Sequence, residues 1–358
     1  AAPICIIAPI SSWAAAVNSY VPEDAGITGF QLFLRTIPYN LYALLTIAMV
    51  LYIIITGFDF GLMKKHENNA ARGDLFTSGK DEFDQIKQED NVTNGHVMDL
   101  VLPVAVLIIT AIGAMIYTGF LDSATDIITA FAGCDAETSL IFSTLITVMF
   151  MFVLYLPRKV ITFKGFMDSL AEGFKLMVPA VTILIFAWSL KGIGDALGIA
   201  SFVEGVVGSN ASASVIIPAI MFAIGIFLAF STGTSWGTFA ILVPIVVAMF
   251  STAENLEMMI ISVSAVLAGA VCGDHVSPIS DTTVMSSAGA QSNHINHVST
   301  QMQYAMVVAA VCFVGYIFAG FVKIWWLVLL VSLAMLLGVL TLMRHFGGSK
   351  GEKAKSNG

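Results

Sequence analysis

The sequence predicts an all-α, polytopic membrane protein with broken or re-entrant helices. Three observations predict this fold class. Only 11% of the 358 residues are charged, whereas soluble domains carry about 25%. The mean hydropathy is +0.88. Several apolar stretches also reach the roughly 20 residues that a helix needs to cross a bilayer. The net charge of −8 comes mostly from loops, so it gives no reason to expect nucleic acid as a partner.

Residues 1–63 are expected to hold the first membrane segments. Residues 1–18 are apolar but short, and residues 37–57 form an uninterrupted span. The chain begins AAPICIIAPISSW, with neither a methionine nor the basic region that opens a signal peptide. We therefore expect a truncated start, with the chain being a fragment of a longer protein.

The rest of the chain divides into a hydrophilic loop at 64–96, a membrane domain at 97–343 and a tail at 344–358. The spans expected in the membrane domain are 97–120, 138–156, 176–199, 258–273, 303–322 and 324–343. Lysine and arginine are concentrated in the 64–96 loop, near 158–164 and in the tail, which predicts that these segments are cytoplasmic.

A break is predicted inside the apolar stretch 214–250, at the sequence FSTGTSWGTF of residues 230–239. Gly233 and Gly237 each lower helix propensity by about 1 kcal/mol relative to alanine, and the neighbouring hydroxyls compete for backbone partners. Such a break either forms part of an ion site or provides a small-residue packing face. The stretch crosses the membrane either as a hairpin or as one broken helix.

A second break is predicted at GDHVSPISDTT, within residues 274–283. Pro278 disfavours helix before it, so helix, break, helix is expected, with Ser280 or Asp281 as the N-cap of the second helix. Asp274 follows an apolar helix, and a carboxylate in the membrane costs about 2.5–3.5 kcal/mol, which makes it a functional candidate by default. Asp281 is either a second such carboxylate or a structural cap.

The motifs STGTSWGT and GDHVSPISDTTVMSSAGA, followed by NHINHVSTQMQYA, closely resemble the C-terminal half of NhaC-type Na+/H+ antiporters of the ion-transporter superfamily. The resemblance implies an inverted-repeat fold of which this chain carries one half, so that the missing N-terminal half becomes a partner. It also implies ion-binding and translocation roles for the matching positions, which are Thr232, Gly233, Thr234, Ser235, Asp274, Ser277, Pro278, Asp281 and Thr282. A homodimer is left open.

The function expected from this resemblance is Na+/H+ antiport across the cell membrane by alternating access. Na+ is a hard cation that prefers oxygen ligands, so we expect it at Asp274 and Asp281. Partial burial raises the pKa of a carboxyl group in general, which lets Na+ and H+ compete for the same ligand. His275 is the candidate for a pH response, because histidine titrates near neutrality.

Other functions remain as alternatives. A Na+- or H+-coupled exchanger of a small organic solute, a dicarboxylate or an amino acid, has the same fold, and a channel is not formally excluded. The chain has no HExxH motif, and neither an enzyme nor a cofactor is expected. A transition-metal site formed with His294 and His297 is not expected either, because both lie in a polar segment that suits solvated or capping roles.

Two smaller features complete the prediction. Lys191 and Asp195 lie four residues apart in the 176–199 span and can pair on one helix face. The four cysteines lack a C-x-x-C spacing and are interpreted as small apolar packing residues. They are Cys5, Cys134, Cys272 and Cys312.

Overall fold

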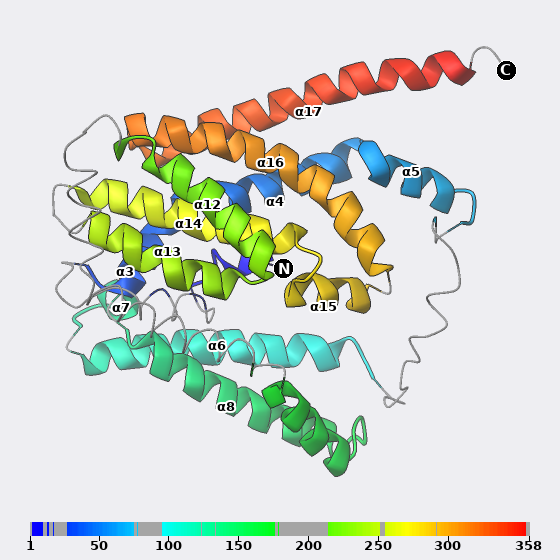
Figure 1. Ribbon diagram of the computed structural model, residues 1–358. Helices are drawn as coiled ribbons and strands as arrows, with labels where there is room; N and C mark the ends of the chain where they lie inside the picture. Colours follow the sequence, from blue (N-terminus) through cyan, green and yellow to red (C-terminus); the bar gives the residue numbers. More distant parts are fainter. Residues whose placement is uncertain are drawn as a thin grey trace. The chain divides into compact units, whose positions relative to one another are not determined.

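The computed structural model describes residues 2–9, 13, 17, 27–74, 77, 95–122, 124–132, 134–175, 178, 214–250, 255–290 and 292–355. Every regular element in these ranges is a helix (Figure 1). Six of these helical stretches are long and apolar enough to cross a membrane. The predicted all-α, polytopic membrane fold is therefore confirmed. The predicted span 176–199, with its pair of Lys191 and Asp195, lies outside the described residues except for position 178.

The membrane-length helices largely follow the predicted spans. They are α4 (Leu41–Thr56), which α5 (Gly61–Ala70) continues, α6 (Met98–Leu121), α8 (Ala136–Tyr155), α14 (Leu256–Val276), α16 (His294–Val322) and α17 (Trp325–Lys355). The shorter helices are α1 (Ala2–Cys5), α3 (Gly29–Thr36), α7 (Ile127–Ala132), α12 (Ile217–Thr232), α13 (Ser235–Met249) and α15 (Asp281–Gly289), with the 3-10 turn η1 (Ile37–Tyr39).

Local sequence explains where α4 begins and ends. The side chain of Asn40 accepts a hydrogen bond from the Ala43 amide at 3.2 Å, which caps the first turn. Gly57 ends the helix with φ 59°, a left-handed conformation that glycine adopts at little cost. Helix then resumes as α5 (Gly61–Ala70), most of which lies in the segment predicted as a hydrophilic loop, 64–96. Similarly, α17 continues through most of the predicted tail.

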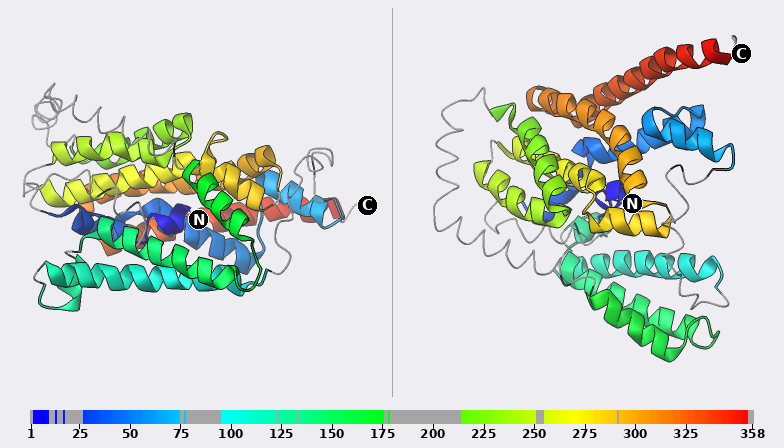
Figure 2. Two further views of the ribbon diagram at one scale, coloured as in Figure 1. Left: turned by 90° about the horizontal axis from the view of Figure 1, so that it is seen from below. Right: turned by 45° about the vertical axis from the view of Figure 1, so that its right-hand side comes forward.

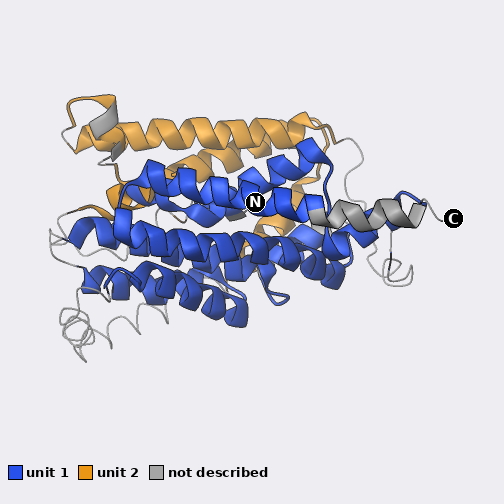
Figure 3. Ribbon diagram, turned by 90° about the horizontal axis from the view of Figure 1, so that it is seen from above, with its two compact units in different colours: residues 1–7, 35–86, 191–358 blue, residues 8–34, 87–190 orange. Residues whose placement is uncertain are grey.

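The chain divides into two compact units, which Figure 3 colours separately. The smaller unit consists of residues 8–34 and 87–190. In it α6 packs on both α7 and α8, and a Cβ at Gly119 would lie 1.8 Å from the Ala130 carbonyl oxygen. The absence of a side chain at Gly119 therefore lets α7 pack directly on α6. The Arg158 guanidinium pairs with the Asp99 carboxylate in this unit.

The larger unit, residues 1–7, 35–86 and 191–358, is built around α14. The apolar part of α14 is 89% buried, and α4, α12, α13 and α16 pack against it. A Cβ at Gly269 would lie 2.4 Å from the Phe222 carbonyl oxygen, and one at Gly273 would lie 2.3 Å from that of Ile226. Glycine therefore brings the backbones of α12 and α14 into contact, as small residues do between membrane helices.

The stretch 214–250 folds as a helical hairpin. At 1.5 Å per residue, α12 with 16 residues and α13 with 15 are each shorter than the roughly 30 Å of a bilayer core. The last turns of α12 lie beside the end of α14, where a Cβ at Gly273 would lie 2.8 Å from the Phe230 amide nitrogen. From there α13 turns back along α14, and the three helices lie side by side in Figures 1 and 2. Of the two predicted arrangements, the structure has the hairpin.

Candidate functional site

The first predicted break occurs at the tip of this hairpin. Helix α12 ends at Thr232, and Gly233 follows with φ 69° while its amide donates to the Ala229 carbonyl at 2.8 Å. Thr234 is extended, with φ −146° and ψ 128°, and α13 begins at Ser235. The left-handed glycine closes the first helix, and the extended threonine reverses the chain. The predicted interruption of the helix is confirmed.

The second predicted break is also present. Helix α14 ends at Val276, and Ser277, just before Pro278, has ψ 128°, the extended conformation that a following proline favours. The next helix, α15, begins at Asp281. The Ser280 hydroxyl accepts a hydrogen bond from the Thr283 amide at 3.3 Å, so Ser280 is the predicted N-cap. The side chain of Asp281 lies outside the described residues.

These two breaks contact each other, although more than 40 residues separate them in the chain. The Ser277 hydroxyl donates to the Phe230 carbonyl at 2.8 Å. A Cβ at Gly233 would lie 2.8 Å from the Ile279 carbonyl oxygen. The non-helical backbone of the hairpin tip therefore rests on the non-helical backbone that follows α14.

The Asp274 carboxylate lies where the two breaks meet, and the residue is only 2% exposed. Oδ2 accepts hydrogen bonds from the Ser235 hydroxyl at 2.9 Å and from the Thr282 hydroxyl at 3.2 Å. Oδ1 accepts one from the Ser280 hydroxyl at 2.6 Å. Hydrogen bonds to an ionised group are stronger than neutral ones, and they offset part of the cost of burying the carboxylate.

The structure brings only part of the predicted set to this carboxylate. Ser235 and Thr282 contact it, whereas the exposed Thr232 donates to the Leu228 carbonyl at 2.8 Å. Ser277 joins the two breaks, and the Pro278 carbonyl lies 2.7 Å from His294 Nε2. Gly233 and Thr234 shape the hairpin tip rather than contacting the carboxylate through side chains.

Ser280 and Thr283 are the site residues that the predicted set did not contain. The Ser280 hydroxyl donates to the carboxylate at 2.6 Å. The Thr283 hydroxyl donates to the Asp274 carbonyl at 3.2 Å. A signal for Ser280 was present, because the sequence indicates it as an N-cap candidate. The same Ser280 hydroxyl that accepts from the Thr283 amide as the N-cap donates its proton to Asp274.

The side chains of this cluster offer oxygen atoms as possible ligands. The cluster consists of Asp274, Ser235, Ser280 and Thr282. A hydroxyl group has one proton to donate and two lone pairs to offer. The three hydroxyls donate to the carboxylate in the present arrangement, and by rotating they can instead offer lone pairs to a cation. Carboxylate and hydroxyl oxygens suit a hard cation. Among the described residues, no group of three His, Cys, Asp or Glu side chains is placed to hold a metal ion.

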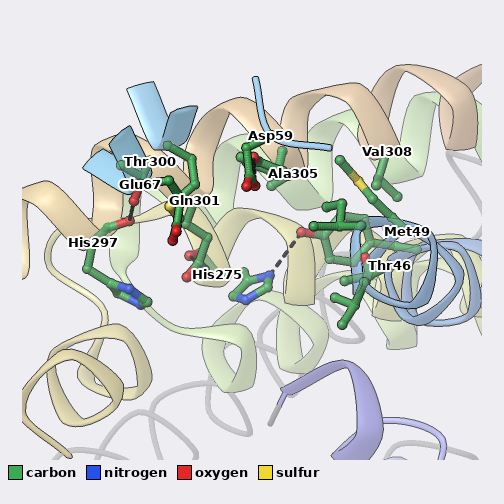
Figure 4. Close-up of a pocket in the computed structure, with 15 residues that line it drawn as sticks. Thr46, Met49, Asp59, Glu67, His275, His297, Thr300, Gln301, Ala305 and Val308 are labelled. Carbon is green, nitrogen blue, oxygen red and sulfur yellow. Dashed lines mark hydrogen bonds between the residues drawn. The ribbon is translucent and has the colours of Figure 1, made fainter. Parts of the chain in front are cut away.

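His275 lies next to this cluster in the chain but is oriented elsewhere. Its Nδ1 is 3.0 Å from the Tyr42 hydroxyl on α4, and the Gln301 side chain on α16 donates to its carbonyl. The imidazole lines a separate pocket between these helices (Figure 4). A pH response through His275 stays a prediction. His294 binds the break through the Pro278 carbonyl and is 3.1 Å from the Ser287 hydroxyl.

The sequence profile described as the Na+/H+ antiporter family matches residues 4–321. The chain belongs to the Na+/H+ antiporter family. It is accordingly a multi-pass membrane protein, and the family resemblance seen in its motifs is confirmed. Family and fold indicate a transporter rather than an enzyme.

Two curated relatives of this antiporter-family chain are longer than it. A protein of Haemophilus influenzae described as uncharacterized is 36% identical over 332 residues, which are 90% of this chain and 62% of the relative. The malate-2H+/Na+-lactate antiporter of Bacillus subtilis is 28% identical over 165 residues, 44% of this chain and 34% of the relative. The chain thus spans about three fifths of the first relative. No solved structure gives a significant match.

Proposed function

We propose that this antiporter-family chain takes part in Na+/H+ exchange across the cell membrane, with Asp274 as the ligand that Na+ and H+ share. The observation that carries the proposal is the buried Asp274 carboxylate, 2% exposed, with three hydroxyl oxygens within 3.2 Å of it. A proton neutralises the carboxylate directly. Na+ neutralises it with the hydroxyls as additional oxygen ligands. The carboxylate cannot hold H+ and Na+ at full occupancy at the same time. This competition couples the movement of one ion to that of the other.

Alternating access is the second part of the proposal. The carboxylate lies between two helix breaks, and discontinuous helices form ion sites at repeat interfaces in many secondary transporters. Unwound backbone is tolerated at membrane depth where it is buried or lines a wet cavity. We propose that a second, inverted half outside this chain provides the other wall of the site, with a homodimer as the alternative source. On this proposal, residues 1–358 by themselves insert into the membrane but do not exchange Na+ for H+.

Exchange of an organic acid coupled to Na+ or H+ is the alternative, because the Bacillus subtilis relative is named as a malate-2H+/Na+-lactate antiporter. An organic carboxylate needs a cationic group or helix N-termini for binding. The chain contains four arginines, Arg35, Arg72, Arg158 and Arg344, and Arg158 is already paired with Asp99. The helix N-termini at the site, those of α13 and α15, adjoin the Asp274 carboxylate, which repels an anion. We therefore favour cation exchange, and malate-driven Na+ movement in vesicles distinguishes the two functions.

The test replaces Asp274 by asparagine in the full-length protein. In everted vesicles, Na+ should dissipate the respiration-driven pH gradient with the unchanged protein but not with Asp274→Asn. Asp135→Asn is the matched control, since Asp135 caps α8 and asparagine is an equally good N-cap. Ser280→Ala should retain exchange with a Na+ half-saturation about tenfold higher, which corresponds to the loss of about 1.4 kcal/mol. Normal exchange by Asp274→Asn at normal expression would refute the assignment.

A further inference from the structure

The pocket that His275 lines lies in the larger unit, on a different side of α14 from the Asp274 cluster. Its volume is about 360 Å³, within the roughly 300–1,000 Å³ of small-molecule sites. Helices α4, α5, α14 and α16 and the α4–α5 connection line it, with His275 as the α14 residue (Figure 4). Asp274 is not part of the lining, because its carboxylate is bonded to hydroxyls on α13 and α15 and in the preceding break.

The charged groups that line this pocket are acidic. Two carboxylates line the pocket, the half-buried Asp59 and the exposed Glu67 at its rim. Among the described residues, the lining includes no lysine or arginine, and its histidines are His275 and His297. The neighbouring Lys64 and Lys65 on α5 are exposed and outside it. The Tyr304 hydroxyl donates to Asp59 Oδ1 at 2.9 Å, which fixes this carboxylate in position. The pocket therefore favours a positively charged ligand over an anion.

The remaining lining is mostly apolar or aromatic. Helices α4 and α16 contribute aliphatic side chains, which are Met49, Val50, Ile53, Ala305 and Val308. Tyr42 and Tyr304 add aromatic rings, and Phe60 stacks on Tyr304 with ring centroids 4.3 Å apart. Aromatic rings attract a desolvated organic cation. A bare inorganic ion gains nothing from such walls, whereas a ligand with an apolar body buries surface against them.

We propose that this pocket binds a monovalent organic ammonium ion with a short aliphatic or aromatic body. The ammonium group lies toward Asp59 and Glu67, and the body packs against the aliphatic walls of α4 and α16. The pocket's walls and charges belong to this unit alone, so the proposal does not depend on the exchange mechanism at Asp274. A dicarboxylate is excluded from this pocket by the same two carboxylates, through like-charge repulsion.

The test measures the charge preference of the pocket by thiol labelling of the purified protein. Met63 is half-buried and lines the pocket from α5, so Met63→Cys places a thiol there. Its rates of reaction with a cationic trimethylammonioethyl and an anionic sulfonatoethyl methanethiosulfonate are compared. The exposed native Cys5 provides the reference ratio for the two reagents in the same molecule. We expect the cation-to-anion ratio at the introduced thiol to exceed that of Cys5 about five- to tenfold.

Ligand specificity is measured with butylammonium, butanol and butyrate as competitors of labelling. Butylammonium should slow labelling of the introduced thiol, and butanol and butyrate should not. Combining Asp59→Asn with Glu67→Gln should abolish both the rate preference and the protection, whereas Asp274→Asn should leave both unchanged. Two outcomes measured with Asp59 and Glu67 unchanged would overturn the proposal. One is a rate ratio equal to that of Cys5, and the other is protection by butanol as strong as that by butylammonium. Loss of protection in Asp274→Asn would also overturn it.

Discussion

Replacing Gly233 by alanine perturbs the contact between the two helix breaks directly. Gly233 has φ 69°, and an added Cβ would lie 2.8 Å from both Cγ1 and the carbonyl oxygen of Ile279. Gly57, at the end of α4, has nearly the same conformation, φ 59°, but nothing lies within 4 Å of its Cβ position. The two substitutions therefore share the conformational strain and differ in the clash.

The expected magnitudes follow from these two terms. A left-handed conformation costs an L-residue about 1–2 kcal/mol, and this term applies to both Gly57→Ala and Gly233→Ala. Overpacking adds about 1–3 kcal/mol, and it applies to Gly233→Ala alone, because part of what must move is the Ile279 backbone. The difference in the free energy of unfolding between the two variants is thus about 1–3 kcal/mol.

Two measurements on these variants test the reasoning. The midpoint of thermal unfolding in detergent should fall for both, and further for Gly233→Ala. In vesicles with the full-length protein, only Gly233→Ala should raise the Na+ half-saturation or abolish exchange, since moving Ile279 displaces the neighbouring Ser280 from Asp274. Equal unfolding midpoints together with unchanged Na+ affinity in Gly233→Ala would show that the contact between the breaks has no role in the site.

Two further predictions concern packing and thiol chemistry. Gly269→Ala should lower the free energy of unfolding by about 1–3 kcal/mol, because its Cβ would lie 2.4 Å from the Phe222 carbonyl oxygen. Gly113→Ala is the control. Nothing lies within 4 Å of its Cβ position, so it should be neutral or stabilising in the same unfolding assay. Burial raises the pKa of the Cys134 thiol to about 11, so its reactive thiolate is scarce at pH 8 and increases only as the pH approaches 11. Maleimide at pH 8 should therefore modify the exposed Cys5 and leave Cys134 unmodified until denaturant is added, and rapid labelling of Cys134 in the folded protein by mass spectrometry would contradict this.

The sequence determined the features that depend on local chemistry. Scarce charge and long apolar stretches required membrane helices, and Pro278 and Gly233 required breaks, because each restricts or frees backbone angles without regard to distant residues. The wide spacing of the cysteines also predicted their state: all four are free, and three of them are buried. Asp274 was identifiable because an intramembrane carboxylate is costly wherever the helix lies.

Tertiary structure alone decided which groups converge on Asp274. Ser235 reaches it from 39 residues away only because α12 turns back as a hairpin, a choice that the sequence left open. The Tyr42 hydroxyl meets His275 across 233 residues, and no local pattern links the two. The physical reason is that hydrophobic burial is non-directional and indicates which helices are buried but not their neighbours. The close backbone approach at Gly269 and Gly273 sets α12 against α14, and that packing brings the two breaks together.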